Sequence, residues 1–171
     1  MLYAAEAPVK SGRWAVVQDA TAAGGSRLTN ADARERKLKV ARSSPKDYFE
    51  ITFYAEAKRP YRLWVRGKAE DNSPYNDSVF VQFSNSVDQD GDEIYRINSQ
   101  SAATSNLEDC LSCGLSGWGW QDNGWGESSG GSFTSPKRGR KLFACKRART
   151  DCRSTKSSSR HKLTEIILPD N

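Results

Sequence analysis

The chain has 171 residues, the length of one ordinary domain, and 36% of them are hydrophobic. No segment approaches the run of about 18 apolar residues that a membrane helix requires, and no export signal opens the chain. The sequence therefore predicts no membrane insertion. The net charge of +5 arises at one end, because residues 127–171 hold 11 of the 26 Lys/Arg but only four of the 21 Asp/Glu. A nucleic-acid function would depend on this basic segment alone.

The signals before Tyr48 are weak. A short strand is expected near residues 14–17, followed by a turn at Gly24-Gly25. Residues 31–38 contain helix-forming side chains but no apolar stripe.

Between Tyr48 and Phe83, apolar and polar residues alternate with period two in three segments of strand length. Lys58-Arg59-Pro60 forms a tight connection between the first two segments, and the polar residues 70–76 form a longer loop before the third. The pattern predicts antiparallel strands. The side chains expected to share a buried face are Phe49, Ile51 and Phe53, then Tyr61, Leu63 and Val65, then Val79, Val81 and Phe83.

An acidic run at residues 88–93 could be a calcium loop or a solvated hairpin turn. A calcium loop needs glycine at its sixth position, whereas Gly91 is the fourth residue of this run. The hairpin turn is therefore preferred, and a strand is expected at residues 93–97.

The segment 117–125 interleaves three tryptophans with glycine, amide and carboxylate side chains. Sugars are bound by such mixtures, because a pyranose packs its C–H face on an indole while amides and carboxylates pair with its hydroxyls. Trp118 and Trp120 share one strand face, so filling the core is the preferred alternative for that pair. Trp125 follows Asp122-Asn123-Gly124 and is expected on a turn.

Four cysteines allow several interpretations. Cys110 and Cys113 form a CxxC, but the wider spacing of Cys145 and Cys152 does not suit a four-thiolate zinc site. A local disulfide between Cys110 and Cys113 is favoured, with free thiols as the alternative. The single histidine, His161, lies in the basic segment, and no catalytic motif is present. The sequence thus predicts no enzyme and no required cofactor.

Several segments in order form a pattern that resembles the bacterial carbohydrate-binding modules related to families six and thirty-five. They are residues 5–7, 47–53, 60–68, 76–82 and 117–122. The resemblance implies an all-β, galactose-binding-like jelly-roll β-sandwich that binds a polysaccharide or other glycan without catalysis. It also implies an extracellular or cell-surface location within a larger multidomain protein. The carbohydrate contacts that it favours lie on two loops: Tyr75, Asn76 and Asp77, and Gln121, Asp122, Asn123 and Trp125.

Members of these families often hold a structural calcium through an acidic pair near the N-terminus and an aspartate in the last strand. Here Ala4 stands at the first of these positions, and Glu6 alone remains as a candidate ligand. The C-terminal strand pair that ends such modules is missing too. The resemblance therefore makes calcium possible in the family but doubtful in this chain.

The amino-acid composition changes after Gly126, because residues 127–160 are rich in Ser, Lys and Arg. Back-translation read from the third base of each codon lets residues 141–149 spell T-I-R-V-Q-T-R-E-D, and continuing through Ser159 gives G-L-S-I-D-Q-I-V-L-S. This is the missing family ending. The hypothesis is a shift of reading frame, with a β-sandwich at residues 1–126, incomplete at its C-terminal end. Residues 127–171 then form a basic, poorly ordered tail.

Two other functions remain open. Residues 137–162 could bind nucleic acid or another polyanion, although Phe143 is their only aromatic side chain and phosphate contacts would dominate. The chain could also be a structural adhesion domain with no small ligand.

Overall fold

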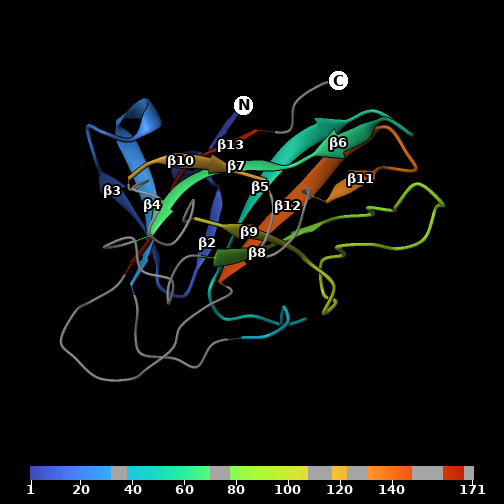
Figure 1. Cartoon of the computed structure of the whole chain (residues 1–171), viewed down its shortest axis with the longest axis horizontal. Helices are drawn as coiled ribbons and strands as arrows, with labels where there is room; N and C mark the ends of the chain where they lie inside the picture. The colour runs from blue at the N-terminus through green and yellow to red at the C-terminus, as the bar shows by residue number, and fades with distance from the viewer. Residues whose placement is uncertain (32–37, 70–77, 108–116, 123–130, 148–159, 168–171) are drawn as a thin grey trace.

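A computed structural model describes residues 1–31, 38–69, 78–107, 117–122, 131–147 and 160–167 (Figure 1). These residues form an all-β sandwich. Their only helical elements are two 3-10 turns, η1 (Ala4–Glu6) and η2 (Ala23–Gly25). None of the helices among them is long and apolar enough to cross a membrane. The all-β class expected from the period-two pattern is confirmed.

The first sheet has the strand order β10-β7-β13-β4-β3, with β1 paired to β13. Its strands are antiparallel neighbours, and its β7–β10 edge carries the aromatic segment described below. The strands are β1 (Leu2–Tyr3), β3 (Trp14–Gln18), β4 (Ser26–Ala31), β7 (Trp64–Ala69), β10 (Gly119–Gln121) and β13 (Arg160–Ile167).

The second sheet has the order β2-β5-β12-β8-β9, and a separate pair joins β6 to β11. Its central strand, β12, lies between β5 and β8 (Figure 1). The strands are β2 (Val9–Ser11), β5 (Tyr48–Ala55), β6 (Pro60–Arg62), β8 (Ser78–Phe83), β9 (Ala103–Asn106), β11 (Ser132–Thr134) and β12 (Gly139–Arg147).

The nine side chains expected to face the core are all buried. Alternate residues of a strand point to opposite faces of the sheet, so the period-two pattern places these side chains between the two sheets. The sheets meet, for example, where the Trp14 ring of β3 packs edge-on against Phe49 of β5, with centroids 5.0 Å apart. The predicted strand near residues 14–17 is thus present as β3.

The acidic run forms a turn, as predicted. The Asp88 side chain accepts hydrogen bonds from the backbone N–H groups of Asp90 (3.0 Å) and Asp92 (2.9 Å), and Val87 bridges to Glu93. The strand expected at residues 93–97 does not form. Tyr95 has a φ of 51°, in the left-handed region, which interrupts an extended strand.

The chain after Gly126 differs from the expected tail. Strand β12 pairs with β5 from Gly139 to Lys146, and it supplies Phe143 and Cys145 to the core. Residues 131–147 are therefore part of the sandwich, and the sheet is not left incomplete at β5 and β8. In the sequence, the many Lys and Arg residues of this segment obscure the alternation of Phe143 with Cys145. The remaining residues of that segment, apart from the backbone of β13, lie outside the described residues.

Candidate functional site

The outward side of β7, and of the end of β6 before it, carries large and charged side chains. Along residues 62–68, every second position is Arg62, Trp64, Arg66 or Lys68, while the intervening Leu63, Val65 and Gly67 are buried. The alternation of a strand therefore separates a core-facing row from a solvent-facing row. The period-two pattern predicted the buried row, whereas the outward row was not predicted as a site.

Two more tryptophans extend this row: Trp120 within β10, and Trp118 directly before it. Trp120 pairs directly with Arg66 and Gly119 with Gly67, so Trp118 and Trp120 lie on the same side of the sheet as Arg66 and Lys68. Trp120 is 36% exposed and Trp118 is half-buried. The preferred interpretation of this pair as core residues was wrong. Pairing with β7 turns their side of β10 outward, and Gly119 takes the inward position.

We call this surface the tryptophan face. Its members are three indole rings and the three cations between them: Trp64, Trp118, Trp120, Arg62, Arg66 and Lys68.

The Trp118 ring is held from several sides. Its Nε1 donates a hydrogen bond to Thr21 Oγ1 at 3.0 Å. The Arg66 guanidinium lies 5.4 Å from the ring centroid and the Lys68 ammonium lies 4.9 Å from it, both within cation–π range. These contacts fix the ring orientation, so the aromatic surface is preformed rather than assembled by a flexible loop.

Asp19 anchors the Thr21 side of this contact. Its carboxylate accepts hydrogen bonds from the Thr21 hydroxyl (2.6 Å), the Thr21 N–H (3.0 Å) and Arg27 Nε (2.8 Å). These bonds, the Thr21 hydroxyl first among them, lower the pKa of Asp19 to about 2, and the charge of Lys68 contributes in the same direction. Asp19 is therefore ionised at neutral pH and holds Thr21 in position for the Trp118 bond.

Asp122 lies at the other end of the tryptophan face, directly after β10. Its carboxylate forms an ion pair with Arg62, whose guanidinium also lies 5.5 Å from the centroid of the Trp64 ring. Asp122 was predicted to contact carbohydrate, and the structure places it beside the indoles. The Asp122 side chain is only 10% exposed, and its ion-pair partner among the described residues is Arg62.

Gln121, the other described member of the predicted contact set, lies opposite Val65. Because Val65 is buried, the alternation puts Gln121 on the opposite side of β10 from Trp120. The structure therefore does not bring Gln121 onto the tryptophan face. The predicted contacts Tyr75, Asn76, Asp77, Asn123 and Trp125 lie outside the described residues.

The structure describes the one residue predicted to bind calcium, Glu6. Glu6 is exposed in η1, and among the described residues no group of three His, Cys, Asp or Glu side chains could hold a metal ion. Calcium at Glu6 stays a prediction. Cys110 and Cys113, the predicted disulfide, lie outside the described residues, whereas Cys145 is a free, buried thiol whose pKa is raised by burial.

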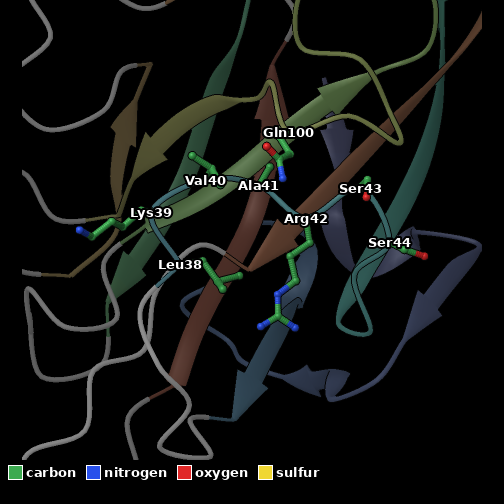
Figure 2. Close-up of a pocket in the computed structure, with 8 residues that line it drawn as sticks. All are labelled: Leu38, Lys39, Val40, Ala41, Arg42, Ser43, Ser44 and Gln100. Atoms are coloured by element: carbon green, nitrogen blue, oxygen red, sulfur yellow. The ribbon is translucent and has the colours of Figure 1, made fainter.

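The second sheet carries two hollows on its outer side. The larger has a volume of about 420 Å³ and is lined by residues 38–44 and Gln100 (Figure 2). The smaller, about 160 Å³, shares Ser43 and Ser44 with it and adds Tyr48, Glu50 and Lys146. Lys146 Nζ donates to the Arg42 carbonyl at 3.1 Å, so it ties the segment 38–44 to β12. Neither hollow presents a set of exposed aromatic rings, which distinguishes both from the tryptophan face.

Sequence reasoning missed Trp64, Arg66 and Lys68 as site residues. The signal was present in the alternation itself, because the positions between core residues of a strand face solvent, and a tryptophan there is unusual. What the sequence lacked was the pairing of β7 with β10, which gathers the three indoles.

No protein-family model and no curated protein matches this chain. Among solved structures, the chain is similar to a Paenibacillus xanthan lyase, with a TM-score of 0.57 and 15% sequence identity. The similarity covers 99% of this chain but only 13% of the lyase chain. The chain thus spans about an eighth of that protein's length. At this identity, the likeness shows a shared β-sandwich fold.

Proposed function

We propose that this chain is a non-catalytic carbohydrate-binding module that binds a polysaccharide through the tryptophan face. The observation that carries the proposal is the row of three outward-facing indoles, on β7, on β10 and directly before β10, with Trp120 36% exposed. Surface tryptophans without a partner are unfavourable in water, and gathered ones mark binding surfaces.

The chemistry of the surface suits a sugar chain. An indole covers the C–H face of a pyranose, and the flanking Arg and Lys N–H groups donate hydrogen bonds to its hydroxyls. The indoles lie on paired strands, and the Trp118 ring is fixed by Thr21 and Lys68, so little conformational entropy is lost on binding. An open sheet face also admits a long polymer at any point along its length.

The comparison supports the same class of function. The similar β-sandwich belongs to a protein whose name states that it cleaves a polysaccharide, and this chain matches only a small part of it. Because this chain matches 13% of the lyase chain, we propose that it is one module of a larger extracellular or cell-surface protein. On this proposal, the tryptophan face holds the chain on its glycan and contributes no reaction.

Polyanion binding through residues 137–162 has less support. Lys141 is 6% exposed and Lys146 is 3% exposed in β12, so these two ammonium groups are not available to phosphates. Among the described residues of that segment, the exposed cations are Lys137, Arg138 and Arg140, and Arg138 forms an ion pair with Glu56.

Affinity gel electrophoresis against a panel of neutral and acidic polysaccharides tests the proposed function. The double variant Trp118→Ala/Trp120→Ala should lose at least about tenfold in affinity, equivalent to about 1.4 kcal/mol. Tyr54→Ala is the matched control, because Tyr54 is an aromatic residue 56% exposed on β5 of the other sheet. Circular dichroism would establish that each variant is folded. No retention of the folded parent chain by any polysaccharide, or equal loss in both variants, would overturn the proposal.

A further inference from the structure

We propose that the smaller hollow on the second sheet binds a single neutral sugar unit, such as the end of a glycan chain. The inference goes beyond the proposed function, because it assigns a second site on the other sheet and does not require the tryptophan face to bind. The hollow has a volume of about 160 Å³. At about 30 Å³ for each water molecule, this is the room of about five waters, which suits one sugar ring rather than a stretch of polymer.

The lining of this hollow is mainly polar. Six of its lining residues carry a donor or an acceptor in the side chain: Ser43, Ser44, Tyr48, Glu50, Asn98 and Lys146. They come from the segment before β5, from β5 itself, from the loop at 97–98 and from the end of β12. The strand pairing therefore brings together hydrogen-bonding groups that are far apart in the sequence.

Lys146 supplies a cation at the wall of the hollow. Its side chain is almost fully buried, and its Nζ donates a hydrogen bond to the Arg42 carbonyl at 3.1 Å. Because Ser43 and Ser44 directly follow Arg42, this bond holds the ammonium beside the segment that lines the hollow. An ammonium has three N–H donors, and the Arg42 carbonyl is its hydrogen-bond partner among the described residues. Two donors are left for an acceptor in the hollow.

Glu50 supplies the opposite charge without closing the hollow. Tyr48 pairs directly with Lys146, and Glu50 lies two residues further along β5, so all three side chains are on the outer side of the sheet. Burial lowers the pKa of the Lys146 ammonium, and the nearby charge of Glu50 partly opposes this effect. In the described part of the chain, however, no ion pair joins the two groups. A cationic donor and an anionic acceptor thus line one hollow without satisfying each other.

This arrangement suits two neighbouring hydroxyls of a sugar. One hydroxyl accepts a hydrogen bond from the Lys146 ammonium, while the next donates to the Glu50 carboxylate. Asn98 and the two serines add neutral donors and acceptors, and Tyr48 adds one aromatic side chain for the C–H groups. The charges of Lys146 and Glu50 cancel, so the lining favours an ion of neither sign. A simple anion would also meet the Glu50 carboxylate, which a neutral sugar uses as an acceptor.

Nitrogen–proton correlation NMR of the full chain tests the site. The probes are galactose, glucose, mannose and xylose, with inorganic phosphate and acetate as anionic comparisons. At least one sugar should shift the amide signals of Ser44, Tyr48 and Asn98, with a Kd on the order of 1–10 mM. Phosphate and acetate should leave these signals in place.

Two variants locate the binding groups. Lys146→Met should weaken the sugar affinity at least about tenfold, and Glu50→Gln, which keeps the shape of the side chain, at least about threefold. Lys137→Met and Glu56→Gln are the matched controls, because both residues are exposed and neither lines the hollow. The controls should bind the sugar as the parent chain does.

The outcomes separate this site from the tryptophan face. The Trp118→Ala/Trp120→Ala variant should keep the sugar-dependent shifts at Ser44, Tyr48 and Asn98, and loss of these shifts would overturn the inference. It is also overturned if no sugar shifts the three signals, if phosphate or acetate shifts them and the sugars do not, or if Glu50→Gln binds the sugar as tightly as Glu56→Gln. In each of these cases, retention of polysaccharides through the indoles would leave the proposed function standing.

Discussion

Phe133 of β11 stacks on Phe83 of β8, with ring centroids 3.8 Å apart and an angle of 25° between the ring planes. Phe133 also stacks on Tyr61 of β6, at 5.9 Å. A residue from the Ser-, Lys- and Arg-rich segment is thus joined to two rings of the predicted strands. This contact makes the segment after Gly126 part of the core.

The Phe133→Ala variant should lower the free energy of unfolding by about 3–5 kcal/mol, because it removes a buried ring and leaves a cavity. Denaturant unfolding followed by tryptophan fluorescence measures the change. Tyr54→Ala, an exposed aromatic truncation, should change stability by less than about 1 kcal/mol. Equal stability of Phe133→Ala and the parent chain would show that β11 does not pack on Phe83.

Lys146 should make stability depend on pH. It is buried in β12, and burial lowers the pKa of its ammonium, an effect partly opposed by the charge of Glu50. The unfolded chain then binds more protons than the folded chain between the lowered pKa and about 10.4, so the free energy of unfolding rises with pH through that window. Lys146→Met should remove this rise and add about 1–2 kcal/mol at pH 7.

The measurement is denaturant unfolding at a series of pH values from 7 to 10, with Lys39→Met as the exposed control. The same pH slope in Lys146→Met and the parent chain would contradict a charged, buried Lys146.

Asp19 should stabilise the fold above its pKa. Because hydrogen bonds from Thr21 lower that pKa to about 2 from an ordinary value near 3.8, the contribution is complete above about pH 5 and is mostly lost as the pH falls to about 2. Asp19→Asn should therefore lower stability by about 1–2 kcal/mol at pH 7, with the difference from the parent chain vanishing near pH 2. Thermal unfolding at both pH values measures this. A difference that is constant with pH would assign the effect to shape rather than charge.

The shifted reading frame makes a separate prediction. A chain in which the shifted reading replaces the sequence from Lys141 onward would exchange the buried Lys141 and Lys146 for threonines and place Ile and Val at positions 142 and 144. It would also place Arg and Gln at positions 143 and 145, so Ile and Val would face the core only if the strand moves by one residue relative to β5. Removal of buried ammonium groups and gain of aliphatic side chains should raise the melting temperature by at least about 5 °C. Differential scanning calorimetry of the two chains decides it, and an unchanged or lower melting temperature in the restored chain refutes the hypothesis.

The sequence by itself determined the strands of β5, β6–β7 and β8 and the side of each that faces the core. Alternation is a local property, since consecutive side chains of any strand point to opposite sides, and Phe49, Tyr61 and Val79 needed no partner to be assigned. The turn at Asp88 is also a local feature, because the Asp88 carboxylate accepts hydrogen bonds from the backbone N–H groups of Asp90 and Asp92.

Only the tertiary structure decided which surface could bind. Trp64 and Trp120 are far apart in sequence, and they share a face because β7 pairs with β10 in a register that sets Trp120 against Arg66. The place of β12 was not evident from the sequence either, because Lys141 and Lys146 are basic residues that are buried in the structure. Lys146 lies between β5 and β8, and Lys141 pairs with Phe53 of β5. Strand pairing depends on partners that are distant along the chain, and alternation within one segment carries no information about which partner it will meet.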